Sequence, residues 1–374
     1  MILMKLSLNN FMSFNDFKIN LSYPKKIVNS LITDEYLKDR SNFRYKKVVI
    51  LMGANASGKT SLGLMLNRIS NFIQQTRTSE LIEAVTDRKK NAAFIMDFLP
   101  DYQEFNLYRL SVIIEGSKDS LHKDPVVKAV VKKEEIYTRD SYESVAKRIV
   151  INEEDYTEDL YGELKKIPHF GFFFMHPTER VSFISKRKDD SVYLKILETV
   201  LKVLDPSITS VDKVENSSNS YNIHMCNERN ILVQDGNVVN PYLLSSGTKA
   251  GIAVADMITA IRQHECGFYY CDEKFSYIQS DVEKTILTLM TDMLGDGEQL
   301  FFTTHNSDIL DIPYPKHSFV FLKKNVFDGK VTIDCINADT YLKRNTDSLR
   351  NSVENDLFST APDTSMLFDI SSTL

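Results

Sequence analysis

The sequence predicts an α/β fold, because two stretches of the chain alternate buried strands with amphipathic helices. In the first stretch, an apolar run at residues 48–52 is followed by a loop with two glycines and then by residues 61–75, whose apolar positions recur at helical spacing. In the second stretch, which begins after residue 243, helical and strand patterns alternate again. A sheet with helices packed against it is therefore the expected architecture.

The elements expected in the second stretch alternate in type along the chain: a helix at 248–264, a strand at 268–271, a helix at 278–293, a strand at 300–303, and a hairpin with strands at 318–322 and 331–336. Residues 76–240 give mixed signals, with short strand-like pieces and one helical pattern at 192–204. Residues 17–21 alternate as a strand does, and a polar, lysine-rich segment follows at 24–47.

Composition excludes several classes of protein. The chain has 374 residues, 43% of them hydrophobic, and its 45 Lys and Arg against 51 Asp and Glu give a net charge of −6, which argues against a uniformly basic nucleic-acid coat. Its four cysteines form no CxxC pair, which disfavours a zinc ribbon or a disulfide scaffold. No apolar run reaches the length of a signal peptide or a membrane span, so we expect a cytoplasmic protein without a membrane partner.

The loop between the first strand and its helix fits the phosphate-binding pattern GxxxxGK[ST] in full. Its glycines allow successive backbone N–H groups to curl around phosphates, and the start of the following helix adds positive potential. Lys59 is expected to reach the β- and γ-phosphates, and Thr60 to ligate Mg²⁺. The residues predicted to bind the nucleotide here are Gly53, Asn55, Ala56, Ser57, Gly58, Lys59, Thr60 and Ser61.

Two carboxylates end the strand predicted at 268–271. Ligands of α/β sheets bind at the carboxyl ends of strands, so Asp272 and Glu273 are expected near the phosphates. Asp272 would help to hold Mg²⁺, and Glu273 would act as the general base that polarises the attacking water. An ordinary acidic turn is the alternative, and the complete phosphate loop upstream favours the catalytic interpretation.

Two further candidate sites for anion binding lie at the ends of predicted elements, one before a helix and one after a strand. Ser245 and Gly247, in a Ser-Ser-Gly turn before a helix, could present a hydroxyl and a backbone N–H to an anion, although a plain helix cap is an equally ordinary use of serine. His305 follows a buried strand, where it could stabilise charge on the γ-phosphate.

The order of these four motifs resembles that of the ABC-type ATPases: Walker A, signature, Walker B and H-loop. Within them, the opening Leu6-Ser7-Leu8-Asn9-Asn10-Phe11-Met12-Ser13-Phe14 resembles the RecF, SMC and OLD-like branch. The segments LSSGTKAG and DEKFSYIQSDVEKTIL are most similar to those of the small AAA15/AAA21-type ATPases of bacterial defence loci. The match covers roughly residues 1–75 and 240–340.

This resemblance implies an ABC-ATPase head, with a mixed sheet around the helix after the phosphate loop and an inserted α+β or helical subdomain. The implied divisions follow the chain: an N-terminal lobe with Walker A at 1–75, the inserted antiparallel-β and helical subdomain at 76–240, a C-terminal lobe with signature, Walker B and H-loop at 241–340, and a partly ordered tail at 341–374.

The resemblance also implies a mechanism. Two heads bind head to tail around two ATP molecules, so that Ser245 and the Gly247 N–H of one subunit touch the γ-phosphate held by Lys59 of the other. One motif set per chain then implies a homodimer that closes on ATP and hydrolyses it to ADP and phosphate, with Mg²⁺ as cofactor. The D-loop equivalent would fall near residues 277–280. Because Lys274 follows Glu273 and could depress its basicity, slow hydrolysis is expected.

Three functions are open at this point. The leading hypothesis, which the resemblance implies, is the sensor or regulatory subunit of an anti-phage defence complex that controls a separate effector, a nuclease or toxin. The effector is expected on another chain because the segment after His305 has no DxD cluster for a nuclease of its own. The alternative is a RecF-like DNA-binding ATPase of DNA repair. Its support is weak, since the basic clusters are short and flanked by acids, and residues 186–188 are the best candidate. The third, a transporter nucleotide-binding domain, is disfavoured by Thr248 in the signature.

The glutamine of the Q-loop is not assigned to one position, and Gln74, Gln75 and Gln103 are the candidates.

Overall fold

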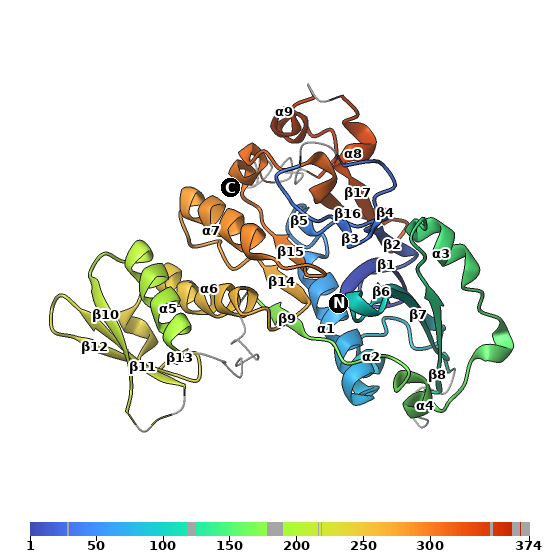
Figure 1. Ribbon diagram of the computed structural model, residues 1–374, viewed down its shortest axis with the longest axis horizontal. Coiled ribbons are helices and arrows are strands. Elements are labelled where there is room, and N and C mark those ends of the chain that lie inside the picture. The colour runs from blue at the N-terminus through green and yellow to red at the C-terminus, as the bar shows by residue number, and fades with distance from the viewer. Residues whose placement is uncertain are drawn as a thin grey trace.

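Two sheets enclose helix α1 (Lys59–Gln75), the helix that follows the glycine-containing loop (Figure 1). The computed structural model describes residues 1–27, 30–117, 125–177, 190–215, 217, 219–344, 347–360 and 367. Within these ranges the chain forms a larger body around the two sheets and a smaller lobe joined to it by helix α6 (Ser246–Arg262). The larger body carries the phosphate loop.

The first sheet has six strands in the order β17-β16-β5-β15-β14-β9. Its strands are β5 (Val48–Met52), β9 (Phe172–Met175), β14 (Phe268–Asp272), β15 (Gln299–Thr303), β16 (Phe319–Phe327) and β17 (Lys330–Asn337). All neighbours are parallel except the hairpin pair of β16 and β17. The strands β5, β14 and β15 are buried at every residue, because helices cover both faces.

The second sheet is antiparallel, with the order β2-β1-β6-β7-β8. Its strands are β1 (Ile2–Asn9), β2 (Phe17–Asn20), β6 (Ala92–Leu99), β7 (Asn106–Ile114) and β8 (Val127–Glu135). In β2 buried and exposed residues alternate, as expected for a strand with one face toward a core. The first strand of the chain thus pairs with strands from its middle.

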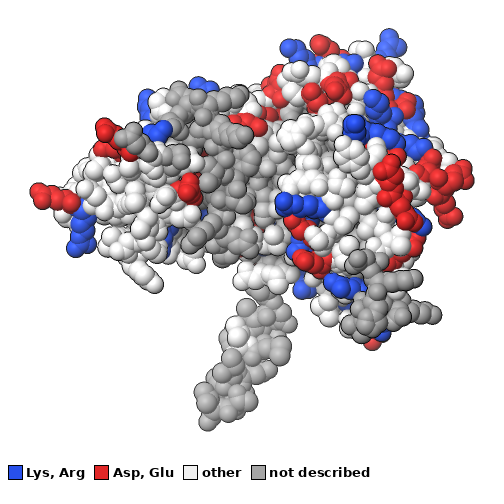
Figure 2. Space-filling model, turned by 90° about the horizontal axis from the view of Figure 1, so that it is seen from below, with Lys and Arg blue, Asp and Glu red and all other residues white. Residues whose placement is uncertain are grey.

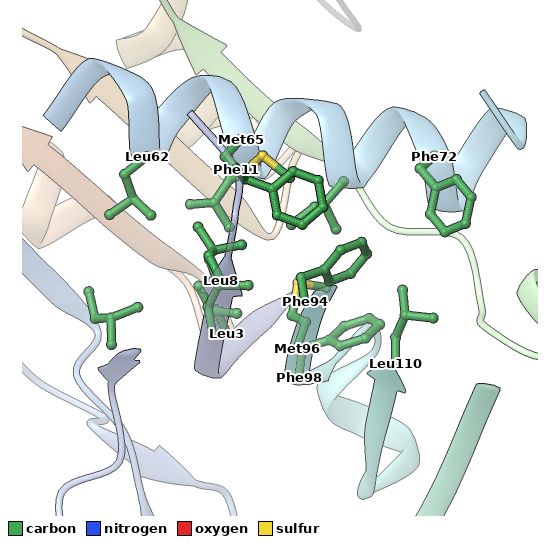
Figure 3. Packing of buried hydrophobic residues seen from close by; sticks show 14 of the residues in the cluster. Leu3, Leu8, Phe11, Leu62, Met65, Phe72, Phe94, Met96, Phe98 and Leu110 are labelled. Carbon is green, nitrogen blue, oxygen red and sulfur yellow. The ribbon is translucent and has the colours of Figure 1, made fainter. Parts of the chain in front are cut away.

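Helix α1 fills the space between the sheets with its apolar stripe (Figure 3). Leu62, Met65 and Phe72 point toward the antiparallel sheet, where Phe94 meets Phe72 edge-on with ring centroids 6.4 Å apart. Its close approach to the parallel sheet depends on Gly63, since a Cβ at that position would lie 2.5 Å from the Phe174 ring. Burial of this stripe on both sides fixes the start of the helix, and with it the phosphate loop.

The other face of the six-stranded sheet is covered by α6 and by α7 (Ser280–Met293). Their apolar residues, among them Met257 and Leu287, pack against Ile50 and Phe302 of the sheet. Two short helices, α8 (Ala338–Tyr341) and α9 (Leu349–Glu354), continue this layer at the C-terminal side.

The smaller lobe has a core of its own. Helix α5 (Asp190–Leu204) packs on a four-stranded antiparallel sheet of β10 (Ile208–Lys213), β11 (Ser220–Met225), β12 (Asn230–Gln234) and β13 (Asn237–Val238). Ile252 and Ala255 of α6 belong to this core, whereas Met257 and Ile258 belong to the core under the six-stranded sheet. Helix α6 is therefore shared by both bodies.

The outer face of the antiparallel sheet has a separate small core under α3 (Tyr142–Arg148) and the strand pair β3 (Tyr36–Leu37) and β4 (Arg40–Arg44). Helices α2 (Ser79–Glu83) and α4 (Leu160–Leu164) lie at the edges of this body. Five 3₁₀ turns complete the described elements: Tyr102–Glu104, Glu153–Asp155, Pro241–Leu243, Ser307–Asp311 and Lys316–Ser318.

The observed architecture differs from the sequence expectation in the middle of the chain. Residues 76–240 do not form one subdomain in the structure, because β6, β7 and β8 complete a sheet with β1 while α5 and β10–β13 form the smaller lobe. The polar segment at 24–47 contains β3 and β4. Of the expected partly ordered tail, residues 345–346, 361–366 and 368–374 lie outside the described residues.

Candidate functional site

The phosphate loop joins the buried end of β5 to the first turn of α1. Three of its residues have positive φ: Gly53 (151°), Ala56 (61°) and Gly58 (106°). The neighbouring β16–β17 hairpin also packs closely against the two glycines. A Cβ at Gly53 would lie 2.4 Å from the Leu322 carbonyl oxygen, and a Cβ at Gly58 would lie 2.6 Å from the Ile333 side chain. Backbone conformation and close packing therefore both require glycine at these positions.

Lys59 lies inside this loop, with only 3% of its side chain exposed. Its ammonium donates to the carbonyl oxygens of Gly53 (2.8 Å) and Ala54 (3.2 Å) and lies 3.2 Å from Glu273 Oε1. Burial lowers the pKa of Lys59, and the negative charge of Glu273 opposes that shift. Lys59 thus reaches from the start of α1 to the end of β14.

Asp272 ends β14 and is fully buried. Its Oδ1 accepts a hydrogen bond from the Thr303 hydroxyl at 2.6 Å, whereas Oδ2 has no hydrogen-bond partner among the described residues. Burial raises the pKa of this carboxyl, and the nearby hydroxyls of Thr303 and Thr60 act in the opposite direction. A buried carboxylate oxygen without a donor, close to a threonine hydroxyl, is suited to a divalent cation.

Glu273 follows in a left-handed backbone conformation (φ 44°), and its N–H donates to the Thr303 hydroxyl at 2.9 Å. This turn directs the carboxylate toward the phosphate loop, where Oε1 lies 2.8 Å from His305 Nε2 and 3.2 Å from the Lys59 ammonium. The hydrogen bond with His305 is the largest cause that lowers the pKa of Glu273, followed by the charge of Lys59. Glu273 is therefore held ionised between the His305 ring and the Lys59 ammonium.

Lys59, Glu273 and His305 line a cavity of about 250 Å³ at the head of α1. Its lining comprises Ser13, Asn55, Ala56, Ser57, Gly58, Lys59, Thr60, Ser61, Glu273, His305 and Lys324. The Ser57 hydroxyl is buried and, like Asp272 Oδ2, has no hydrogen-bond partner within the described ranges. Backbone N–H groups, a buried ammonium and an unpaired hydroxyl are groups that recognise phosphate.

Ser245 and Gly247 lie at the start of α6 and are not part of that lining. The Ser245 hydroxyl accepts from the Thr248 N–H at 3.0 Å, so it caps the helix, and Ser245 itself is exposed. Gly247 lies against the turn predicted as the D-loop, because a Cβ there would be 2.8 Å from the Tyr277 carbonyl oxygen. The structure thus brings together all predicted nucleotide, metal and catalytic residues except this pair.

One expectation about a neighbouring residue requires correction. The ammonium of Lys274 does not contact Glu273: it donates to the His176 and Pro177 carbonyl oxygens, each at 3.1 Å, at the end of β9. The low pKa of Glu273 therefore comes from His305 and Lys59 and not from Lys274. The glutamines considered for the Q-loop are also absent from the cavity lining, since Gln74 and Gln75 end α1 and Gln103 lies in a 3₁₀ turn.

The basic clusters give little support for a nucleic-acid surface. Lys132 pairs with Asp155 at 2.7 Å, and Lys166 pairs with Glu163. Residues 186–188 lie outside the described residues. On the face shown in Figure 2, positive and negative side chains are interspersed over the larger body.

Sequence reasoning missed four residues that belong to the site: Ser13, Tyr270, Thr303 and Lys324. The Tyr270 hydroxyl donates to the Lys59 carbonyl oxygen at 2.6 Å and ties β14 to α1. Ser13 stands within the opening segment that resembled known ATPases, so its motif was a usable signal. Lys324 had no such signal, because only the strand pairing brings it to the loop.

The fold is that of SMC ATPase heads. An SMC head crystallised with the C-terminal winged-helix domain of ScpA is 14% identical and covers 92% of this chain and 100% of its own, with a TM-score of 0.50. An SMC head with an extended coiled coil from Pyrococcus furiosus, bound to the C-terminal domain of ScpA, is 12% identical and covers 91% and 98%, with a TM-score of 0.51. Neither the scan against protein-family models nor the search of curated proteins finds a match.

These likenesses show that the chain has the fold of an SMC head domain. Among the described residues, no helix combines the length and apolar character that crossing a membrane requires.

Proposed function

We propose that the chain is an ABC-type ATPase that binds ATP with Mg²⁺ in the cavity at the head of α1 and hydrolyses it slowly. The observation that carries this proposal is the convergence of Lys59, Glu273 and His305 on one cavity lined by the phosphate loop. These three groups come from three different elements of the fold. Their meeting point is where a terminal phosphate, a base and a charge-stabilising group are needed.

The residues present fit the implied Mg²⁺ ion. Asp272 Oδ2 is buried without a donor, and the Thr60 hydroxyl lies close enough to influence the pKa of that carboxyl. Thr60 and Asp272 would hold the ion, directly or through water. When bound, Mg²⁺ would neutralise part of the charge of the β- and γ-phosphates.

Phosphate would compete with Glu273 for the Lys59 ammonium. In the structure that ammonium is bound to two loop carbonyls and Glu273, so nucleotide binding would free the carboxylate to contact a water molecule. His305 would then orient Glu273 and stabilise developing charge. Since the pKa of Glu273 is lowered, this carboxylate is ionised at neutral pH but is a weak base, which is consistent with slow turnover.

The second half of the site would come from another copy of the chain. Ser245 and Gly247 do not line the cavity of their own chain, and Ser245 is exposed at the start of a helix. In a head-to-tail homodimer, Ser245 of one subunit would face the phosphate held by Lys59 of the other. ATP would therefore close the dimer, since it would be held from both sides.

The broader role that we propose is regulatory: an ATP-switched head that serves as the sensor subunit of an anti-phage defence complex and controls a separate nuclease or toxin. Its support is the similarity of LSSGTKAG and DEKFSYIQSDVEKTIL to ATPases of defence loci. The SMC heads of this fold were crystallised with a bound ScpA domain, so a partner protein on such a head has precedent. A RecF-like DNA-repair ATPase is the alternative, favoured only by the opening segment of β1 and its turn.

The decisive test of the ATP site is Lys59→Ala, measured by calorimetric titration with Mg-ATP. Loss of the ammonium should weaken ATP affinity at least about 100-fold, because it removes a buried charge-assisted contact to phosphate. Lys90→Ala, which removes an exposed lysine, is the matched control and should bind as the wild type does. Unchanged ATP affinity of a folded Lys59→Ala protein would exclude this site.

The broader role is tested by purifying tagged Glu273→Gln from its native host and identifying protein and nucleic acid together. A nuclease or toxin-like protein in stoichiometric amount supports the regulatory proposal. Recovery of DNA alone, lost as salt is raised, would instead support the DNA-repair alternative.

A further inference from the structure

We infer that Lys324, on the β16–β17 hairpin and outside every motif of the chain, is a second phosphate-binding lysine of the nucleotide site. This inference rests on the proposed function. It assigns to the hairpin a direct role in holding the phosphate chain of a nucleoside triphosphate.

The hairpin forms one wall of the phosphate loop. Strand β16 runs parallel to β5, with Phe321 opposite Met52, so its chain continues alongside the loop that leaves β5. The carbonyl oxygen of Leu322 packs against Gly53, and the side chain of Ile333 packs against Gly58. The hairpin therefore touches both glycines that shape the loop.

The pairing of the hairpin determines which lysine faces the site. Lys324 lies opposite Ile333, and residues directly opposite in an antiparallel pair share a face. Because Ile333 contacts Gly58, this is the face toward the loop, and Lys324 lines the same cavity as Lys59. Lys323 lies opposite Asp334 on the other face and lines a different cavity, with Asp16 and Lys18.

The charge balance of the cavity leaves a role for this cation. The Lys59 ammonium is surrounded by the carbonyls of Gly53 and Ala54 and by Glu273, and His305 is also committed to Glu273. Lys324 is exposed and makes no ion pair with any residue that the structure describes. A triphosphate carries about four negative charges, and a flexible lysine in the same cavity is a suitable point charge for it.

A loop from the N-terminal segment positions the same wall. The Asn15 side chain donates to the Val331 carbonyl oxygen at 2.9 Å, which ties the turn after β1 to strand β17. Ser13 of this turn lines the cavity together with Lys324. The two residues approach the phosphate loop from outside its own sequence, which explains why no local motif contains them.

The test compares Lys324→Ala with Lys323→Ala, which removes the same charge from the same strand but from the opposite face. In calorimetric titrations with Mg-ATP at low salt, Lys324→Ala should weaken affinity about tenfold, whereas Lys323→Ala should stay within about twofold. Lys324→Arg should restore most of the affinity. The loss in Lys324→Ala should shrink as salt rises, because a contact between exposed charges is screened.

Equal affinities of Lys324→Ala and Lys323→Ala would overturn the inference. So would a salt-independent loss accompanied by a lowered melting temperature, since that pattern would mean a damaged hairpin. Lys59→Ala, measured alongside, separates this failure from failure of the proposed function. If Lys59→Ala loses ATP and Lys324→Ala does not, only the role of Lys324 is wrong; if neither variant loses ATP, the site itself is wrong.

Discussion

The phosphate-loop region and the signature region differ in how far one chain completes them. Around Lys59, side chains from α1, β14 and β15 already contact one another, and most of their polar atoms are buried. Around Ser245, the helix start is exposed, and the nearby Tyr242 and Tyr277 are 95% and 74% exposed. The first region is assembled by folding, whereas the second ends at the surface.

This difference indicates which steps a single chain can perform. The assembled region has what nucleotide binding requires: loop N–H groups, an ammonium and two unused buried oxygens. The exposed region provides a helix N-terminus and a hydroxyl with no phosphate site of its own nearby. We therefore expect binding to be a property of one subunit and hydrolysis a property of two.

The largest effect is expected for Glu273→Gln. Amide replacement removes the base but keeps the shape, so hydrolysis should fall by at least about 100-fold. ATP affinity should be retained, and light scattering should show a dimer in Mg-ATP that wild-type protein holds only transiently. A variant that keeps ATP bound but stays monomeric in Mg-ATP would contradict the expected division between the two regions.

The sharpest test of the comparison mixes two inactive variants. Ser245→Asp keeps a helix-capping side chain but places a negative charge against phosphate, so it should bind ATP normally yet lose most hydrolysis. Mixed with Lys59→Ala, it forms heterodimers with one intact composite site each. Random pairing then predicts recovery of about a quarter of wild-type activity.

Ser245→Asn is the matched control for that experiment, since it caps the helix without the added charge. Ser245→Asp alone and Lys59→Ala alone should remain inactive at the same total concentration. Activity that does not return on mixing, while light scattering shows mixed dimers, would place both halves of the site in one chain.

A smaller effect is expected for Lys274→Met, which removes the contact between the Glu273 turn and the end of β9. The His176 and Pro177 carbonyls lose their donor, which should lower the free energy of unfolding by about 1 kcal/mol. Hydrolysis should fall about fivefold as the turn loosens, with ATP affinity unchanged because Lys274 does not line the cavity. Lys274→Arg should recover both properties in part, and weaker ATP binding would mean that Lys274 contacts the nucleotide.

The smallest effect concerns acid stability. The pKa of Glu273 is lowered by His305 and Lys59, so the ionised carboxylate stabilises the fold at pH above the ordinary glutamate pKa of about 4.3. That stabilisation is lost as the pH falls through the lower pKa of the folded protein. In urea titrations from pH 7 to pH 3, wild type should therefore lose its advantage over Glu273→Gln. The control is Glu228→Gln, at an exposed position, which should show no such pH-dependent difference from wild type. If wild type and Glu273→Gln also show none, the ionic contacts of Glu273 are absent in solution.

Local patterns predicted the assembled region well. The apolar run at 48–52, the glycines at 53 and 58 and the carboxylates after 271 each carry their information within a few residues, and the structure brings them together. The hairpin strands were also predicted, because alternation and Asp328-Gly329 mark them.

Long-range pairing could not be predicted in the same way. Strand β1 pairs with β6, about ninety residues later, and Gln299 binds the backbone of Leu3 across the sheets, at 2.9 and 3.2 Å. No periodicity in residues 76–240 shows that three of its strands, β6, β7 and β8, belong to the sheet that β1 starts. Lys324 was missed for the same reason, since its position depends on which face of a paired hairpin meets the loop.

The sharing of α6 between two cores has a consequence for mutational tolerance. Most of its 17 residues are buried, and at Gly251 even a methyl group would meet Leu204 at 2.4 Å. A helix with one solvent face can accept neutral changes there, but this helix has almost no such face. Substitutions along α6 must keep its contacts with both cores, so the segment that begins with the signature has little freedom to diverge.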